Sequence, residues 1–170
     1  YVYNQIFNAL TGRKVIDGGA GNGYSIMTHQ AFGDLANPVA ADITSSPGLE
    51  LACGNTVYNV VLTNNGGLPG NSMTPIQISG QPDGYTSLAD IDLDGKMDVV
   101  VAAEGAVGKL YVWNPNEGSP VLIASINLPN TGGNWIGVPF IGDMDKDCAP
   151  EIGVTRASRV YALEYDGTST

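Results

Sequence analysis

Residues 90–98 read Asp-Ile-Asp-Leu-Asp-Gly-Lys-Met-Asp and place four carboxylates within nine positions. Carboxylates this close repel one another unless a cation lies among them. Calcium takes roughly six to eight oxygen ligands from carboxylates, carbonyls and water. Alternate residues of a tight loop can turn their oxygens toward one point, and Gly95 stands where a sharp turn is needed, because glycine reaches positive φ freely. A solvated acidic turn is the alternative interpretation. The predicted calcium ligands are the side chains of Asp90, Asp92, Asp94 and Asp98 and the carbonyl oxygen of Lys96.

The residues on either side of this run predict strands rather than helices. Residues 99–103 are mostly valine and alanine, a composition typical of a buried strand. An EF-hand would need flanking helices and a bidentate acid at its twelfth position, where this chain has Val101. We therefore expect the metal site to lie in a loop between two strands.

The pattern occurs three times in the chain, at intervals of roughly fifty residues. Each copy is flanked by apolar residues, and a strand-like segment that ends in turn residues lies further along, at 56–59, 110–114 and 160–163. Each unit therefore predicts about four short strands joined by tight turns, with no sustained helical period. This indicates an all-β chain made of β-propeller blades. Each copy opens with an acid and has a second acid eight positions later. The pairs are Asp42 and Glu50, Asp90 and Asp98, and Asp143 and Glu151.

The runs at 90–98 and 143–151, each followed by a β-branched segment, resemble the calcium loops of FG-GAP/VCBS repeats. These repeats form the blades of integrin-α-like propellers and are common in bacterial surface proteins. The resemblance covers residues 38–170, although the Phe-Gly and Gly-Ala-Pro sequences that name the family are not visible. The resemblance implies a role in an adhesin, in a lectin or as a supporting domain of a polysaccharide-degrading enzyme.

The repeat divides the chain into four units. Residues 1–37 are predicted to form the outer half of a blade, and 138–170 the inner half of another. Two whole blades lie between them, at 38–85 with a degenerate loop and at 86–137 with an intact loop. Since propellers need about four blades to close, we predict an open arc or a fragment of a larger propeller.

The other two loops differ in their ligands. The run at 143–151 keeps the acids, but Cys148 takes the glycine position and would be strained at positive φ. The run that opens at Asp42 has Thr44 and Ser46 where acids should stand, which favours a hairpin held by hydroxyl hydrogen bonds over a metal site. The second predicted calcium site comprises Asp143, Asp145, Asp147, Glu151 and the carbonyl oxygen of Ala149.

Composition excludes several classes of partner. The net charge is −10, with 17 acids against 7 bases, so the chain lacks the basic clusters that bind nucleic acid or anionic membranes. No apolar run is long enough to cross a membrane. The two cysteines, Cys53 and Cys148, lie in no metal-binding or redox motif, and free thiols are favoured over a disulfide.

A few isolated residues and segments could suggest catalysis or ligand binding, but each has a simpler interpretation. His29 lacks a nucleophile or an acid–base partner at a suitable spacing, and the glycine-rich residues 18–23 lack the Lys-Ser/Thr of a P-loop. Trp113 and Trp135 could stack on a sugar ring, but core packing is the commoner role of tryptophan in a blade. We therefore predict no catalytic residue and no enzyme activity.

The resulting expectation is a non-catalytic, calcium-stabilised binding, adhesion or structural module with two Ca²⁺ sites. It would be extracellular or at the cell surface, where calcium is millimolar. Its partners would be a protein or glycan ligand at a cell surface, or the remaining blades of the same propeller. The alternatives are a lectin-like propeller or the accessory propeller domain of a polysaccharide-degrading enzyme.

Overall fold

The computed structural model describes residues 5–17, 37–63, 70–129, 133 and 135–168. Within these ranges the regular structure is almost entirely strand, with one short 3-10 turn, η1 (Asn116–Gly118). The prediction of an all-β chain is confirmed. The strands are β1 (Gln5–Phe7), β2 (Lys14–Asp17), β3 (Val39–Ala41), β4 (Glu50–Cys53), β5 (Thr56–Val61), β6 (Ser72–Gln77), β7 (Tyr85–Ala89), β8 (Asp98–Ala103), β9 (Gly108–Asn114), β10 (Val121–Leu128), β11 (Phe140–Gly142), β12 (Glu151–Arg156) and β13 (Arg159–Glu164).

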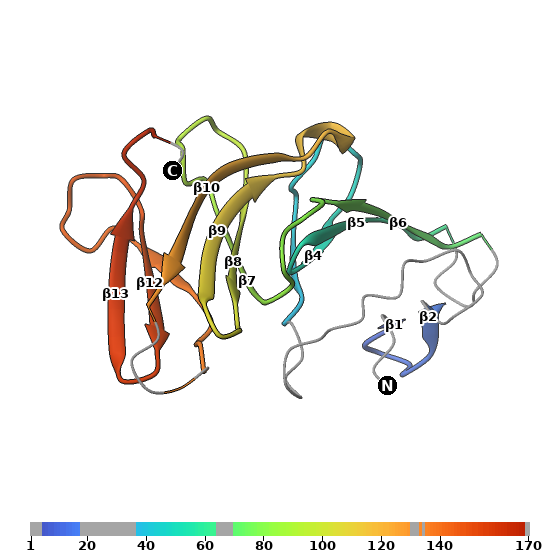
Figure 1. Cartoon of the computed structure of the whole chain (residues 1–170). Helices are drawn as coiled ribbons and strands as arrows, with labels where there is room; N and C mark the ends of the chain where they lie inside the picture. Colours follow the sequence, from blue (N-terminus) through green and yellow to red (C-terminus); the bar gives the residue numbers. More distant parts are fainter. Residues whose placement is uncertain (1–4, 18–36, 64–69, 130–132, 134, 169–170) are drawn as a thin grey trace.

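Each strand in the described part of the chain pairs with its neighbours in sequence. Two four-stranded antiparallel sheets have the orders β3-β4-β5-β6 and β7-β8-β9-β10. They are followed by a three-stranded sheet, β11-β12-β13, and preceded by the β1-β2 pair. This up-and-down order is that of propeller blades. The described sheets form no closed barrel (Figure 1).

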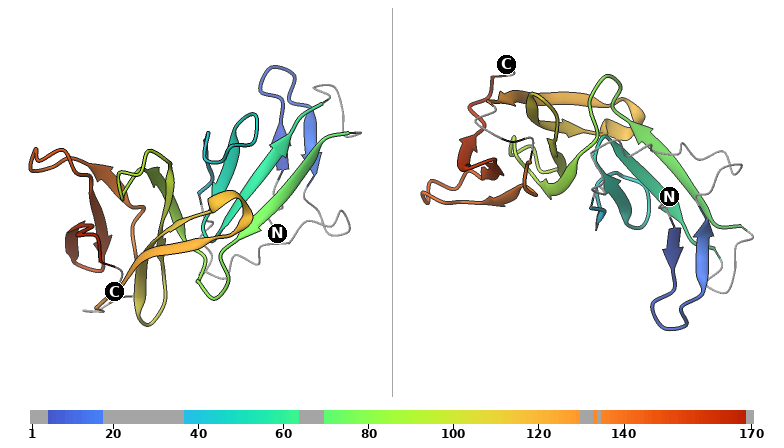
Figure 2. Two further views of the ribbon diagram at one scale, coloured as in Figure 1. Left: turned by 90° about the horizontal axis from the view of Figure 1, so that it is seen from above. Right: turned by 60° about the horizontal axis from the view of Figure 1, so that its bottom comes forward.

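The sheets lie side by side, with their first strands together. β7 contacts β3 on one side and β11 on the other, and Figure 2 shows the sheets following one another in chain order. Ser87 Oγ donates to the carbonyl of Pro139 across the second of these interfaces. The buried Arg156 crosses the same interface and donates to the carbonyls of Gly105 and Ala106, at 3.0 and 3.4 Å.

The core sits between the sheets, and β8 shows why its sequence is a continuous apolar run. All six residues of β8 are buried. Because side chains alternate along a strand, Val99 and Val101 pack toward the preceding sheet, with Trp113, while Val100 packs toward the last sheet, with Ile152. A strand covered on both faces carries no polar alternation. Trp113 is fully buried and donates from Nε1 to the carbonyl of Gly54 at 3.3 Å, so it has the predicted core role.

The four described sheets run from β1 to β2, from β3 to β6, from β7 to β10 and from β11 to β13, and the division of the chain into units at 38, 86 and 138 stays a prediction. The unit 1–37 contains β1 and β2, which pack through Ile16 against Tyr58 and Met73 of the next sheet. Neither cysteine forms a disulfide; Cys53 is buried and Cys148 is exposed. No helix among the described residues is long and apolar enough to span a membrane.

Candidate metal-binding loops

All three acidic runs connect the first and second strands of a sheet, so they occupy equivalent places in the fold. Residues 90–97 join β7 to β8, residues 143–150 join β11 to β12, and residues 42–49 join β3 to β4. The ninth residue of each run begins the second strand. We call these segments the first intact loop (90–98), the second intact loop (143–151) and the degenerate loop (42–50).

The two intact loops share one hydrogen-bond pattern from carboxylates to backbone N–H groups. The acid at position 1 accepts from the N–H of position 6: Asp90 Oδ2 from Gly95 at 2.9 Å, and Asp143 Oδ2 from Cys148 at 3.2 Å. The acids at positions 3 and 5 each accept from the N–H two residues on, at 3.2 and 2.8 Å in both loops. The contacts at positions 3 and 5 are Asx turns. Together the hydrogen bonds fix the acids at positions 1, 3 and 5 against the backbone of the loop.

Both loops also repeat their positive φ angles. At position 4 Leu93 and Lys146 have φ of 59° and 71°, and at position 6 Gly95 and Cys148 have φ of 89° and 77°. The strain foreseen for Cys148 is therefore present, since a side chain is disfavoured in this region. The second intact loop adopts the geometry of the first without its glycine.

In the first intact loop, the carboxylates of Asp90, Asp92 and Asp94 offer oxygens that all lie within 4.8 Å of one another. Asp90 Oδ1 is buried and has no hydrogen-bond donor. Such a group of hard oxygens suits Ca²⁺ or Mg²⁺. The carbonyl oxygen of Lys96 stays a predicted ligand.

Asp98 lies beneath this group and is fully buried. Its Oδ2 accepts from the N–H of Ile91 at 2.9 Å, and its Oδ1 accepts from Asn114 Nδ2 at 2.8 Å. Burial raises the pKa of Asp98 to about 6, against the lowering effect of these hydrogen bonds. Asp98 therefore anchors the loop to β9, and its part in binding an ion stays a prediction.

The second intact loop gathers its acids differently. Asp143, Asp145 and Glu151 form one group, while Asp147 and Glu151 form another with Glu164 of β13. Glu151 Oε2 accepts from the N–H of Met144, and its buried Oε1 has no donor. The pKa of Glu164 is raised, chiefly by the charge of Asp147 and then by burial. The carbonyl oxygen of Ala149 stays a predicted ligand.

Hydrogen bonds stabilise the degenerate loop, which brings no group of acids together. Glu50 Oε2 accepts from the N–H groups of Ile43 and Thr44, at 2.8 and 3.1 Å, and Thr44 Oγ1 accepts from the N–H of Ser46 at 3.2 Å. Pro47 stands at position 6 and has no N–H to donate to Asp42. Among the residues that the structure describes, this loop belongs to none of the acidic groups that could hold a metal.

A carboxylate from the next sheet reaches the degenerate loop. Glu117 of η1 accepts from Ser45 twice, from the N–H at 2.9 Å and from Oγ at 2.8 Å. These hydrogen bonds lower the pKa of Glu117. The contact borders a cleft of about 520 Å³ between the degenerate loop and the first intact loop, lined in part by Asp42, Asp90 and Lys96. Glu117 therefore links two sheets at their loop ends.

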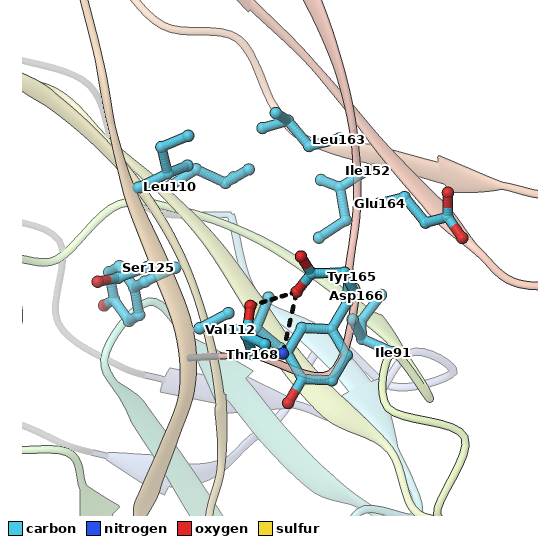
Figure 3. A pocket seen from close by; sticks show the side chains of 13 residues that line it. Ile91, Leu110, Val112, Ser125, Ile152, Leu163, Glu164, Tyr165, Asp166 and Thr168 are labelled. Carbon is cyan, nitrogen blue, oxygen red and sulfur yellow. Dashed lines mark hydrogen bonds between the residues drawn. The ribbon is translucent and has the colours of Figure 1, made fainter. Parts of the chain in front are cut away.

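A second cleft, of about 170 Å³, lies between the third and last sheets (Figure 3). Leu110, Ile152 and Leu163 give it mainly apolar walls, and Asp166 and Thr168 also line it. Thr168 donates to Asp166 from its N–H at 2.9 Å and from Oγ1 at 2.5 Å. Glu164, which also lies beside two acids of the second intact loop, lines this cleft, but none of the predicted metal ligands does.

Several residues stand apart from the loops. His29 and residues 18–23 fall outside the described residues. The core role favoured for both tryptophans is wrong for Trp135, whose side chain is 68% exposed, unlike that of Trp113. Inspection of the sequence did not identify Asn114, Glu164 or Glu117 as part of the loops. A signal existed for the first two: Asn114 ends the strand-like segment 110–114 and Glu164 directly follows the segment 160–163, while Asn59 ends the segment 56–59 of the earlier unit.

The comparisons agree with this architecture over part of the chain. Residues 90–154 match the model of the FG-GAP-like repeat, a span that begins at the first residue of the first intact loop and ends within β12. The chain therefore contains an FG-GAP-like repeat, as the sequence motifs predicted, and such a repeat indicates a β-propeller-type binding or structural module. No curated protein and no solved structure matched the chain.

Proposed function

We propose that this chain is a non-catalytic, calcium-stabilised module for binding, adhesion or structural support at a cell surface. The observation that carries the proposal is the pair of intact loops. Each has the same Asx turns and the same positive φ positions, and each brings three or more carboxylates together. FG-GAP repeats often bind calcium and are generally non-catalytic, which supports the same conclusion.

Calcium suits these loops because of their oxygen chemistry. Four carboxylates and one carbonyl leave room for water within a shell of roughly six to eight oxygens. The Asx turns hold the carboxylates in place, so an ion binds with little reorganisation of the loop. Without an ion the same carboxylates repel one another.

Binding in the loops would stabilise the sheets that they join. Each intact loop begins where an inner strand ends, and its ninth residue begins a strand that is buried over most of its length. An ion that binds only the folded loop adds about 2.7 kcal/mol when its concentration is a hundred times its dissociation constant. Sites of this kind suit the millimolar calcium found outside cells, which supports an extracellular location.

The acids of the intact loops are poorly suited to catalysis. A carboxylate that coordinates calcium is held ionised by the charge of the ion and is a weak general acid near neutral pH. The FG-GAP-like match at 90–154 covers the same loops. We infer that the surfaces around them bind or support a partner rather than convert a substrate.

Carbohydrate binding is a second candidate, favoured by Trp135. An indole that is 68% exposed can stack on a sugar ring. Trp135→Ala should then reduce binding on a glycan array, while Trp113→Phe, a change in the core, should not alter ligand preference. An array with no glycan bound by the wild-type protein would remove this candidate.

Calorimetry with and without chelator tests the main proposal. We expect calcium to raise the melting temperature by several degrees, and Asp94→Ala to remove part of this gain by disabling the first intact loop alone. Asp83→Asn is the matched control, because it removes one negative charge at the opposite end of β7. An unchanged melting temperature after complete removal of calcium would contradict the proposal.

A further inference from the structure

We propose that the last sheet binds a second divalent cation, between Asp147, Glu151 and Glu164, in addition to the calcium ion of the second intact loop. The proposal deepens the proposed function and rests on it, because Glu151 belongs to both sites. The chain would then hold three ions: one in the first intact loop and two beside the second.

The arrangement of the acids is the first observation that supports a second cation. Asp147, Glu151 and Glu164 each offer an oxygen within 4.8 Å of the other two. Asp143 and Asp145 form a separate group that has only Glu151 in common with it. The first intact loop forms just one such group among the described residues. Glu151 is therefore placed to bridge two cations.

A buried oxygen without a donor also favours a cation beside Glu151. Glu151 is only 7% exposed, and its Oε1 atom is buried without any hydrogen-bond partner. Leaving a buried acceptor unpaired costs about 1–3 kcal/mol, and more when it is charged. A cation at this oxygen would remove the cost. The unpaired atom belongs to the carboxylate that the two groups share.

Comparison with the sheet β7-β8-β9-β10 shows which group Glu151 lacks, namely a side-chain donor on the neighbouring strand. Glu164 lies directly opposite Glu151 in the β12–β13 ladder. In the third sheet Asn114 faces Asp98 in the same way and donates an amide N–H to its Oδ1 at 2.8 Å. In the second sheet the residue opposite Glu50 is Asn59. An ionised Glu164 has no hydrogen to donate, so a cation takes the place of the amide.

The surroundings of Glu164 suit a hydrated ion. Its carboxylate points away from the apolar cleft between the third and last sheets (Figure 3). Asp147 and Glu164 are both exposed, so water can complete the shell around an ion bound by three carboxylates. Ca²⁺ and Mg²⁺ both accept such a mixture of carboxylate and water ligands.

Counting ions by equilibrium dialysis against radioactive calcium tests the proposal. We expect three ions per chain in the wild-type protein and two in Glu164→Asn, which places the Asn114 arrangement in the last sheet. Asp166→Asn, a neighbouring charge change outside both groups, should keep three. The melting temperature of Glu164→Asn in chelator should be at least that of the wild type, which shows that the variant folds.

The outcomes separate this proposal from the proposed function. Two ions in the wild-type protein, or the same count in Glu164→Asn as in the wild type, would overturn the second cation while leaving the loop sites intact. No bound calcium in the wild-type protein would overturn both. Asp94→Ala should lose one ion whether or not Glu164 is a ligand, and so reports on the first intact loop alone.

Discussion

The two intact loops reach the same backbone geometry from different residues. Both use carboxylate hydrogen bonds at positions 1, 3 and 5, with Asx turns at positions 3 and 5, and both have positive φ at positions 4 and 6. Yet position 6 is Gly95 in one and Cys148 in the other, and the strand partner of position 9 is Asn114 in one and Glu164 in the other. The carboxylate hydrogen bonds therefore define the loop, and the neighbouring strand decides how much charge it gathers.

The degenerate loop differs too much in sequence from the intact loops to keep their hydrogen-bond pattern. It lacks two acids, and Pro47 removes the N–H that position 6 donates in both intact loops. Glu50 and Thr44 hold it instead, and Glu117 reaches across from the next sheet. A loop in this position of the sheet can thus be stable without an acidic group, provided other hydrogen bonds replace the Asx pattern.

The largest expected difference between the intact loops lies at position 9. Asp98→Ala leaves the N–H of Ile91 and the amide of Asn114 without their acceptor, so in chelator it should lower the free energy of unfolding by about 2–3 kcal/mol. Glu151→Ala unpairs only the N–H of Met144 and relieves repulsion among the acids, so its cost should be about 1 kcal/mol or less. Urea unfolding measures both. Equal costs would show that the two acids anchor their loops alike.

Exchanging the residues at position 6 should have a smaller effect. Gly95→Ala introduces a Cβ at φ of 89°, where it meets no atom within 4 Å, so the conformational cost alone of about 1 kcal/mol remains. Cys148→Gly should raise the free energy of unfolding by about 0.5–1 kcal/mol, because it relieves the same strain and loses some of the gain to chain entropy. Thermal unfolding of both variants checks the opposite signs. A destabilised Cys148→Gly would show that the thiol itself supports the loop.

The sequence predicted the strands and the loops well, and the contacts between elements poorly. Alternating acids, and a β-branched run after each intact loop, determine local structure, so β8, β12 and the positions of the intact loops could be read directly. The place of Trp113 in the core followed from the usual core role of tryptophan in a blade. The roles of Asn114 and Glu164 depend on the register between two strands, which the loop motif does not contain. Glu117 depends on the packing of one sheet against the next.

The smallest effect concerns the thiols and tests whether the second intact loop lies at the surface. Burial raises the pKa of Cys53 to about 12, and the negative charge of Asp83 adds to the shift. Cys148 is exposed. Since the thiolate is the reactive form, alkylation of the native protein near neutral pH should modify Cys148 alone, with Cys53 slower by at least roughly a hundredfold. Mass spectrometry of partly alkylated protein would show it, and labelling of both thiols at similar rates would contradict it.

The central claim is that both intact loops bind calcium and the degenerate loop does not. Anomalous diffraction from crystals grown with calcium tests it most directly. We predict one anomalous peak among Asp90, Asp92 and Asp94, at least one among Asp143, Asp145 and Glu151, and none within residues 42–50. Crystals grown at millimolar calcium with no peak in either intact loop, or with a comparable peak in the degenerate loop, would contradict it.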